Sequence, residues 1–269
     1  MAQEEVKLKR RIFGIVLFLL VIFAAVMSTL AIPDGADNAT AVNATRRAAN
    51  TPESLLAIAG NVTESDFTGF SVTNFWQGFY GNVSGIITLE DGIGNALYNW
   101  STASPGGEIY AANQTTSISW TSVMCLNYSA AAPRNNSGTF GGYGTNTMNL
   151  SELHRAFGFN VSVPSSDNVS ATFKESNTHD QFDTGSLTFS AAECPTAYVF
   201  NSADAPVAGQ FEEVILWDPA NNATIWASIL ENNLNGFDQR FHDFEMLVLE
   251  NGAGTETTTT LYYFWVELQ

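Results

Sequence analysis

Two hydrophobic patterns divide the chain. A continuous apolar stretch runs from Ile12 to Ile32 without a charged residue. At about 1.5 Å per residue, a helix of roughly 20 such residues spans a hydrocarbon core of about 30 Å. From about Phe67 onward, short runs of β-branched and aromatic residues alternate with Gly, Asn, Asp and Pro turns, which is typical of antiparallel strands. The pattern therefore predicts one membrane-spanning helix followed by a mainly β ectodomain.

The recurrent short runs favour an antiparallel β-sandwich, built as one large unit or two small immunoglobulin-like units. The expected strands are Gly69–Trp76, Val83–Glu90, Ala96–Ser101, Ile109–Asn113, Ser117–Leu126, Asn168–Lys174, Ser186–Ser190, Tyr198–Asn201, Glu212–Trp217, Thr224–Leu230, Phe244–Leu249 and Thr258–Glu267. One amphipathic helix is expected near Leu150–Phe157. Two stretches, Ile87–Trp100 and Ile215–Trp226, share an apolar strand, an Asp-led turn, an Asn-Ala pair and a strand that closes on Trp. Each predicts a hairpin, and the likeness reflects either two related units or the general similarity of hairpins.

Composition sets the other boundaries. Residues 1–11 form a basic cytoplasmic tail, residues 12–32 the transmembrane or filament-core helix, and residues 67–269 the β-rich, glycosylated ectodomain. Residues 33–66 are polar and small at first and predict a stalk. Within it, Thr51-Pro52 has the form of a helix start, and we expect a short helix over Ser54–Ala59 that ends at Gly60.

Charge gives the apolar helix its orientation. Lys7, Lys9, Arg10 and Arg11 precede it, and the positive-inside rule keeps that end in the cytoplasm. Everything after Pro33 is then extracellular. The formal net charge is -17, and an acidic ectodomain repels phosphate backbones, so nucleic acid is excluded as a partner. The expected partners are the membrane, through Ile12 to Ile32, and other surface proteins or further copies of the chain.

The N-terminal residues also allow two processed forms. Thr29-Leu30-Ala31 is an acceptable signal-peptidase site, although the apolar run is longer than the usual 7–15 residues of a signal peptide. Arg10–Gly14 followed by Ile15–Phe18 resembles the N-terminus of archaeal pilins and archaellins. Those proteins are cleaved after the Gly and pack the apolar helix in a filament core. Phe13 departs from their pattern, which prefers a charged residue before the Gly.

Glycosylation sequons are dense after the apolar segment, and none precedes it. The acceptors are Asn38, Asn43, Asn61, Asn82, Asn99, Asn113, Asn127, Asn135, Asn149, Asn160, Asn168 and Asn222. If N-linked glycans are attached there, these residues must face solvent. The sequon positions therefore agree with the predicted topology.

The chain has two cysteines, Cys125 and Cys194, both on the predicted outer side. In an oxidising compartment we expect them to form a disulfide, the alternative being two separately buried thiols. Their spacing is not that of a zinc site or of a thioredoxin-type redox centre.

No residue pattern marks a catalytic, metal or cofactor site. The histidines are His154, His179 and His242, and none has a ligand spacing such as HExxH. Acids are dense around His242, between Phe237 and Glu245, but a solvated loop or strand edge is the better interpretation. Gly81–Gly85 is not a nucleophile elbow, because its Ser is displaced by one residue. We therefore expect no enzyme activity and no cofactor, and no loop specifies calcium.

Aromatic residues gather in two clusters, Phe75–Tyr80 and Tyr262–Trp265. Such clusters form either a sugar-stacking platform or core packing, and packing is favoured because half of each strand faces the core. The outward half of Tyr262–Trp265 is a candidate edge for a neighbouring subunit.

Two stretches, Asn74–Gly85 and Leu261–Leu268, resemble segments of uncharacterised archaeal membrane-anchored surface glycoproteins. The resemblance implies a location in the cell envelope and no catalytic residues. We therefore expect a structural or adhesive cell-surface glycoprotein, anchored by one N-terminal helix. The alternatives are a subunit of a pilus-like filament and an extracellular solute-binding module or enzyme.

Overall fold

The computed structural model describes residues 32–101, 106–113, 118–126, 128, 149–160, 165–250 and 259–269. The basic tail and the apolar segment Ile12–Ile32, except its last residue, lie outside these ranges. Within the described ranges, no helix combines the length and the apolar character needed to cross a bilayer.

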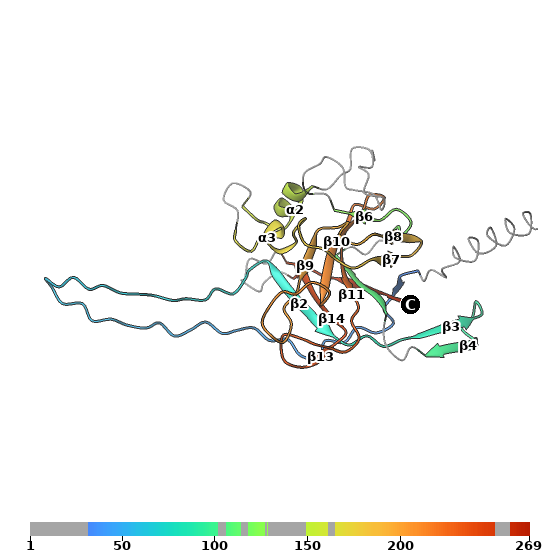
Figure 1. The fold of residues 1–269 in the computed structure, drawn as a ribbon, viewed down its shortest axis with the longest axis horizontal. Coiled ribbons are helices and arrows are strands. Elements are labelled where there is room, and N and C mark those ends of the chain that lie inside the picture. Colours follow the sequence, from blue (N-terminus) through green and yellow to red (C-terminus); the bar gives the residue numbers. More distant parts are fainter. Residues whose placement is uncertain are drawn as a thin grey trace, which may run out of the picture.

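A seven-stranded antiparallel sheet forms the centre of the body (Figure 1). Its strand order is β1-β15-β5-β11-β10-β6, and β9 also pairs with β10. The bounds are β1 Asp34–Gly35, β15 Tyr263–Leu268, β5 Gly107–Ala112, β11 Ala223–Ile229, β10 Glu212–Asp218, β6 Met124–Cys125 and β9 Thr196–Tyr198. The first and the last described strands therefore meet in one sheet, and the prediction of a mainly β, antiparallel fold is confirmed.

Layers cover both faces of this sheet. On one face lies a two-stranded sheet of β2 (Trp76–Gly81) and β14 (Phe244–Leu249), with the short helices α2 (Leu150–Ala156) and α3 (Val169–Thr172). On the other face lie the hairpin of β7 (Phe182–Thr184) and β8 (Leu187–Phe189) and the two cysteines.

The central strand β10 is buried on both sides. Its Ile215 and Trp217 belong to the cluster under β14, whereas Val214 and Leu216 belong to the cluster under β7–β8. This double burial explains why β10 is a continuous apolar run rather than an alternating one.

Three elements lie outside these layers. Residues 36–74 form a long arm without helix or strand, the hairpin of β3 (Ile86–Glu90) and β4 (Ala96–Ser101) projects from the body, and β12 (Leu234–Asn235) pairs with β13 (Phe241–His242). Figure 1 shows the arm and the β3–β4 hairpin extending in opposite directions. Because β1 pairs with β15 before the arm begins, the range expected as a stalk leaves the body and returns to it.

The short helix expected over Ser54–Ala59 is wrong, because residues 51–58 have no regular structure. Leu55, Leu56 and Ile58 are all exposed, so no packed face supports a helix there. Isolated helices of this length are unstable in water without tertiary packing.

Most expected strands are present, but four differ. Among them, only Tyr198 of the strand expected over Tyr198–Asn201 lies in a strand, β9. Ala96–Ser101 and Phe244–Leu249 have the predicted bounds, whereas Asn168–Lys174 contains α3. Of the described part of Ser117–Leu126, which begins at residue 118, only Met124–Cys125 is a strand. The strand expected over Gly69–Trp76 is wrong, because β2 begins only at Trp76.

The error at α3 has a local cause. Asn168 Oδ1 accepts a hydrogen bond from the Ala171 N–H, and this cap outweighs the β-favouring composition of the segment.

The two hairpins predicted from their shared pattern both form. In each, an Asp side chain closes the turn: Asp91 Oδ1 accepts from the Asn95 N–H at 2.9 Å, and Asp218 Oδ1 from the Ala220 N–H at 2.9 Å. The first hairpin is β3–β4 and the second is β10–β11. Their surroundings are opposite, because every residue of β3–β4 is exposed whereas β10–β11 is the buried centre of the sheet.

Candidate functional site

Most of the described sequon acceptors lie on the surface. Exposed acceptors are Asn38, Asn43, Asn61, Asn82, Asn99, Asn113, Asn160 and Asn222, whereas Asn127 and Asn135 lie outside the described residues. An attached oligosaccharide needs solvent around the acceptor. These exposed positions therefore have the accessibility that N-glycosylation requires.

Two acceptors instead serve as helix caps. Asn149 caps α2 in a reciprocal capping box with Glu152, and this helix is close to the one predicted over Leu150–Phe157. Asn168 is more constrained: its Nδ2 donates to the Ser165 carbonyl at 2.7 Å, while its Oδ1 accepts from the Ala171 N–H and the Ser170 hydroxyl. Because Asn168 is also buried, its amide is inaccessible in the folded chain.

We predict that Asn168 carries no glycan while Asn160 is modified. The two acceptors are a matched pair, because cleavage after Arg155 and Lys174 leaves both in one tryptic peptide. A glycan on Asn168 requires the loss of its hydrogen bonds and its burial, whereas Asn160 is exposed. Fragmentation of that glycopeptide assigns the site, and a glycan on Asn168 would contradict the prediction.

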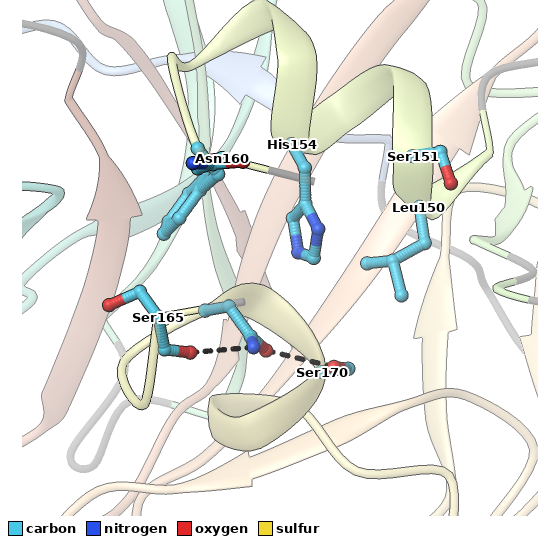
Figure 2. Close-up of a pocket in the computed structure, with 8 residues that line it drawn as sticks. Leu150, Ser151, His154, Asn160, Ser165 and Ser170 are labelled. Atoms are coloured by element: carbon cyan, nitrogen blue, oxygen red, sulfur yellow. Dashed lines mark hydrogen bonds between the residues drawn. The ribbon is translucent and has the colours of Figure 1, made fainter. Parts of the chain in front are cut away.

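A small hollow lies between the two helices (Figure 2). It encloses about 200 Å³ and is lined by Leu150, Ser151, His154, Phe159, Asn160, Ser165, Asn168 and Ser170. Figure 2 shows His154 pointing from α2 towards α3. The His154 Nε2 accepts a hydrogen bond from the Val169 N–H at 3.2 Å, and burial lowers the pKa of its ring. The neutral ring therefore joins the two helices, and its Nε2 lone pair is already engaged.

His179 has a similar structural role beside the disulfide. Its Nε2 accepts hydrogen bonds from the N–H groups of Glu193 and Cys194, at 3.0 and 2.9 Å, and its Nδ1 lies 2.6 Å from the Asp180 carbonyl oxygen. Burial lowers the pKa of this ring. The Cys125–Cys194 disulfide that His179 supports is present, with 5.0 Å between the Cα atoms, which confirms the predicted pairing.

The acid-rich segment around His242 closes one end of the β2–β14 layer. His242 Nε2 lies 2.8 Å from Asp238 Oδ1, Arg240 forms an ion pair with Asp238, and the Tyr80 ring packs edge-on against His242. Glu245 is buried behind them, which raises its pKa to about 7. In the part of the chain that the structure describes, no three His, Cys, Asp or Glu side chains are arranged to hold a metal ion. The contacts instead fix the β12–β13 turn.

Two buried glutamates that the sequence analysis did not single out face each other across adjacent strands. Glu108 on β5 and Glu267 on β15 are direct partners in the register, and both are buried. Glu267 accepts hydrogen bonds from the Tyr110 hydroxyl at 2.8 Å and the Gly185 N–H at 3.0 Å. Burial, with the charge of Glu267, raises the pKa of Glu108 to about 9, and burial raises that of Glu267 to about 7. Glu108 therefore holds a proton at neutral pH.

This protonation predicts a stability that falls as the pH rises. A carboxyl whose pKa is raised on folding contributes its full stabilisation at pH values below its unfolded pKa of about 4.5. That contribution is lost as the pH rises towards its folded pKa of about 9. Glu108→Gln keeps a neutral side chain at every pH. Between pH 5 and pH 9, we expect the free energy of unfolding of this variant to rise by at least about 1.4 kcal/mol relative to that of the unsubstituted protein. This amount corresponds to a shift of one pKa unit.

Denaturant unfolding across that pH range measures the difference. Glu90→Gln is the matched control, because Glu90 lies in an exposed strand. Parallel stability curves for Glu108→Gln and the unsubstituted protein would contradict a buried, protonated Glu108.

The aromatic clusters are mainly packing elements, as favoured from the sequence. Trp76 packs against Trp226 and Phe173, and Phe79 packs edge-on against Phe264. The C-terminal strand β15 is not a free edge along its whole length, because it lies between β5 and the two-residue strand β1. Tyr80 is the exposed member of the Phe75–Tyr80 cluster.

No family model, curated protein or solved structure matches the chain. Functional inference therefore rests on the chain's own residues. Of the features that the sequence analysis missed, the Glu108–Glu267 pair had a visible signal, since each Glu interrupts an otherwise apolar strand. Their pairing depends on the sheet order, which the sequence pattern does not contain.

Proposed function

We propose that the protein is a structural or adhesive cell-surface glycoprotein, anchored in the membrane by one N-terminal helix over residues 12–32. The observation that carries the proposal is the distribution of the sequons. All of them follow the apolar segment, and eight of the described acceptors, from Asn38 to Asn222, are exposed. N-glycosylation of a membrane-anchored chain requires acceptors that follow the anchor and are exposed to solvent.

The disulfide and the charge distribution support the same location. Cys125–Cys194 is a buried cross-link of the kind that persists in oxidising surroundings. Four basic residues, Lys7, Lys9, Arg10 and Arg11, precede the apolar segment, whereas the chain as a whole is strongly acidic. Under the positive-inside rule this asymmetry leaves the β-rich body outside the cell.

A second candidate function is that of a subunit in a pilus-like filament. Exposed apolar residues on the arm and on the β3–β4 hairpin favour it, because neither element has a partner surface within the described chain that buries them. In that case the apolar helix packs against the helices of other subunits, and cleavage occurs after Gly14.

Mass spectrometry of the native protein's N-terminal peptide and sequon peptides tests the proposal and separates the two candidates. A start at Met1 or Ala2, together with glycan mass on the exposed sequons, is the expected result. A mature start at Ile15 would favour the filament subunit, and a start after Ala31 would remove the membrane anchor. Unmodified sequon peptides throughout would contradict the glycoprotein.

A further inference from the structure

The β3–β4 hairpin presents a continuous apolar face to solvent. In its register Ile87 is opposite Trp100 and Leu89 is opposite Tyr98, so these four side chains share one face. Thr88 and the sequon residue Asn99 lie on the opposite, mixed face, together with the exposed Ile86 and Leu97. All of these residues are exposed. An isolated two-stranded hairpin is only marginally stable in water, so this apolar face needs a partner.

The chain itself shows how a hairpin of this sequence is accommodated. The similar hairpin β10–β11 lies inside a sheet, where β5 pairs with the outer edge of β11 and β6 and β9 pair with the outer edge of β10. Both outer edges of β3–β4 lack such strands among the described residues. A hairpin with a buried-strand composition and open edges is suited to strand addition.

A matching edge is present on the body at β2. This strand is six residues long, as is β4, and among the strands that the structure describes it pairs with β14 alone. Gln77, Gly78 and Tyr80 on β2 are exposed. The sheet β14–β2 has two strands and lies against a sheet of seven, so added strands would extend the smaller layer over the larger one.

The hairpin is directed away from the β2 edge of its own chain. The linker from β2 to β3 is fixed to the body, because the Val83 N–H donates to Asp243 Oδ2 at 2.8 Å. Gly85 lies so close to Leu268 that a Cβ at this position would be 2.1 Å from the leucine Cδ1. Figure 1 accordingly shows β3 and β4 projecting from the side of the molecule, beyond the end of β2.

We propose that the β3–β4 hairpin of one copy adds to the β2 edge of a second copy, with β4 antiparallel to β2. In this direction the acidic tip of the hairpin, Glu90 and Asp91, lies beside the end of β2 that carries Tyr80. Arg240 is next to Tyr80, with 68% of its side chain exposed, and is one of few cations in an acidic chain. Asp238 occupies one side of its guanidinium, and the remaining N–H donors can meet the tip.

The two faces of the hairpin then have separate roles. Ile87, Leu89, Tyr98 and Trp100 extend the apolar layer of the partner, while a glycan at Asn99 would leave from the opposite face. Because the same edge and hairpin are present on every copy, the contact is head-to-tail and continues from chain to chain. This inference goes beyond the proposed function and does not depend on where in the cell the chain is located.

Cross-linking between two differently tagged full-length copies tests the contact. The natural chain has two cysteines, both in the disulfide, so introduced cysteines are the only free thiols. One copy carries Tyr80→Cys and the other Leu97→Cys, which are opposite when the two six-residue strands overlap fully in antiparallel register. Co-expression, mild detergent extraction and a short bis-maleimide should give a band that contains both tags.

A matched control and a weakened variant make the result decisive. Ser186→Cys is exposed at the β7–β8 turn, across the central sheet from β2, and should not cross-link to Leu97→Cys. Adding Trp100→Thr to the Leu97→Cys copy keeps the Asn99 sequon and should weaken association about tenfold, because a large apolar side chain is lost from the contact. A two-tag band no stronger than the Ser186 control would overturn the proposal, as would a band that Trp100→Thr leaves unchanged. The first of these results is also the one expected if the hairpin rests on lipid.

Discussion

Replacing Cys125 and Cys194 together with alanine is expected to lower the free energy of unfolding by about 4 kcal/mol. The disulfide closes a loop across a sequence separation of 69 residues, and cross-links of such length strongly restrict the unfolded chain. It also fixes the neighbours of the central strand, because β6, which contains Cys125, and β9, which follows Cys194, both pair with β10. Its loss therefore loosens the edge of the sheet as well.

Denaturant unfolding with and without reductant measures this effect. The unsubstituted protein in reductant should lose about the same stability as the double variant. The double variant itself should be insensitive to reductant, since no free cysteine remains beside the pair. Equal stability of the unsubstituted protein and the double variant, each with and without reductant, would contradict the prediction that the cross-link restricts the unfolded chain.

Trp226→Ala is expected to cost about 3–5 kcal/mol of unfolding free energy. Trp226 is 1% exposed and lies where three elements meet. Its ring packs edge-on against Trp76 of β2, with 5.7 Å between centroids, and lies 5.5 Å from the ring of Phe173 at the end of α3. Removing the indole leaves a cavity between the central sheet and the layer above it.

Trp100→Ala is the matched control. Trp100 occupies the corresponding position of the similar hairpin β3–β4 but is 49% exposed. Measured at low protein concentration, where copies do not associate, its substitution should cost less than about 0.5 kcal/mol. Similar losses for the two tryptophans would contradict the different burial of the two hairpins.

This pair of hairpins shows what the sequence can and cannot predict. The Asp-led turn and the closing Trp predicted both hairpins, because turn chemistry and strand period are local. Whether a hairpin is the centre of a sheet or projects into solvent depends on strands remote in sequence. For β10–β11 those strands are β5, β6 and β9, and no local pattern records them.

The errors have a similar origin. Val169–Thr172 has a strand-like composition, and a single side chain, Asn168, turns it into α3. Leu55, Leu56 and Ile58 follow a good helix start, but the arm offers them no surface to pack against. At the candidate sites, the disulfide partners were predictable because the chain has only two cysteines. The Glu108–Glu267 pair was not, because it requires β5 and β15 to be neighbours.

Labelling of intact cells with a membrane-impermeant, amine-reactive reagent tests the central claim, an extracellular body, most directly. The chain has three lysines, of which Lys7 and Lys9 precede the apolar segment and Lys174 is exposed on the body. The account predicts that Lys174 is labelled on intact cells, while any retained Lys7 and Lys9 are labelled only after lysis. Labelling of Lys174 only after lysis would contradict it.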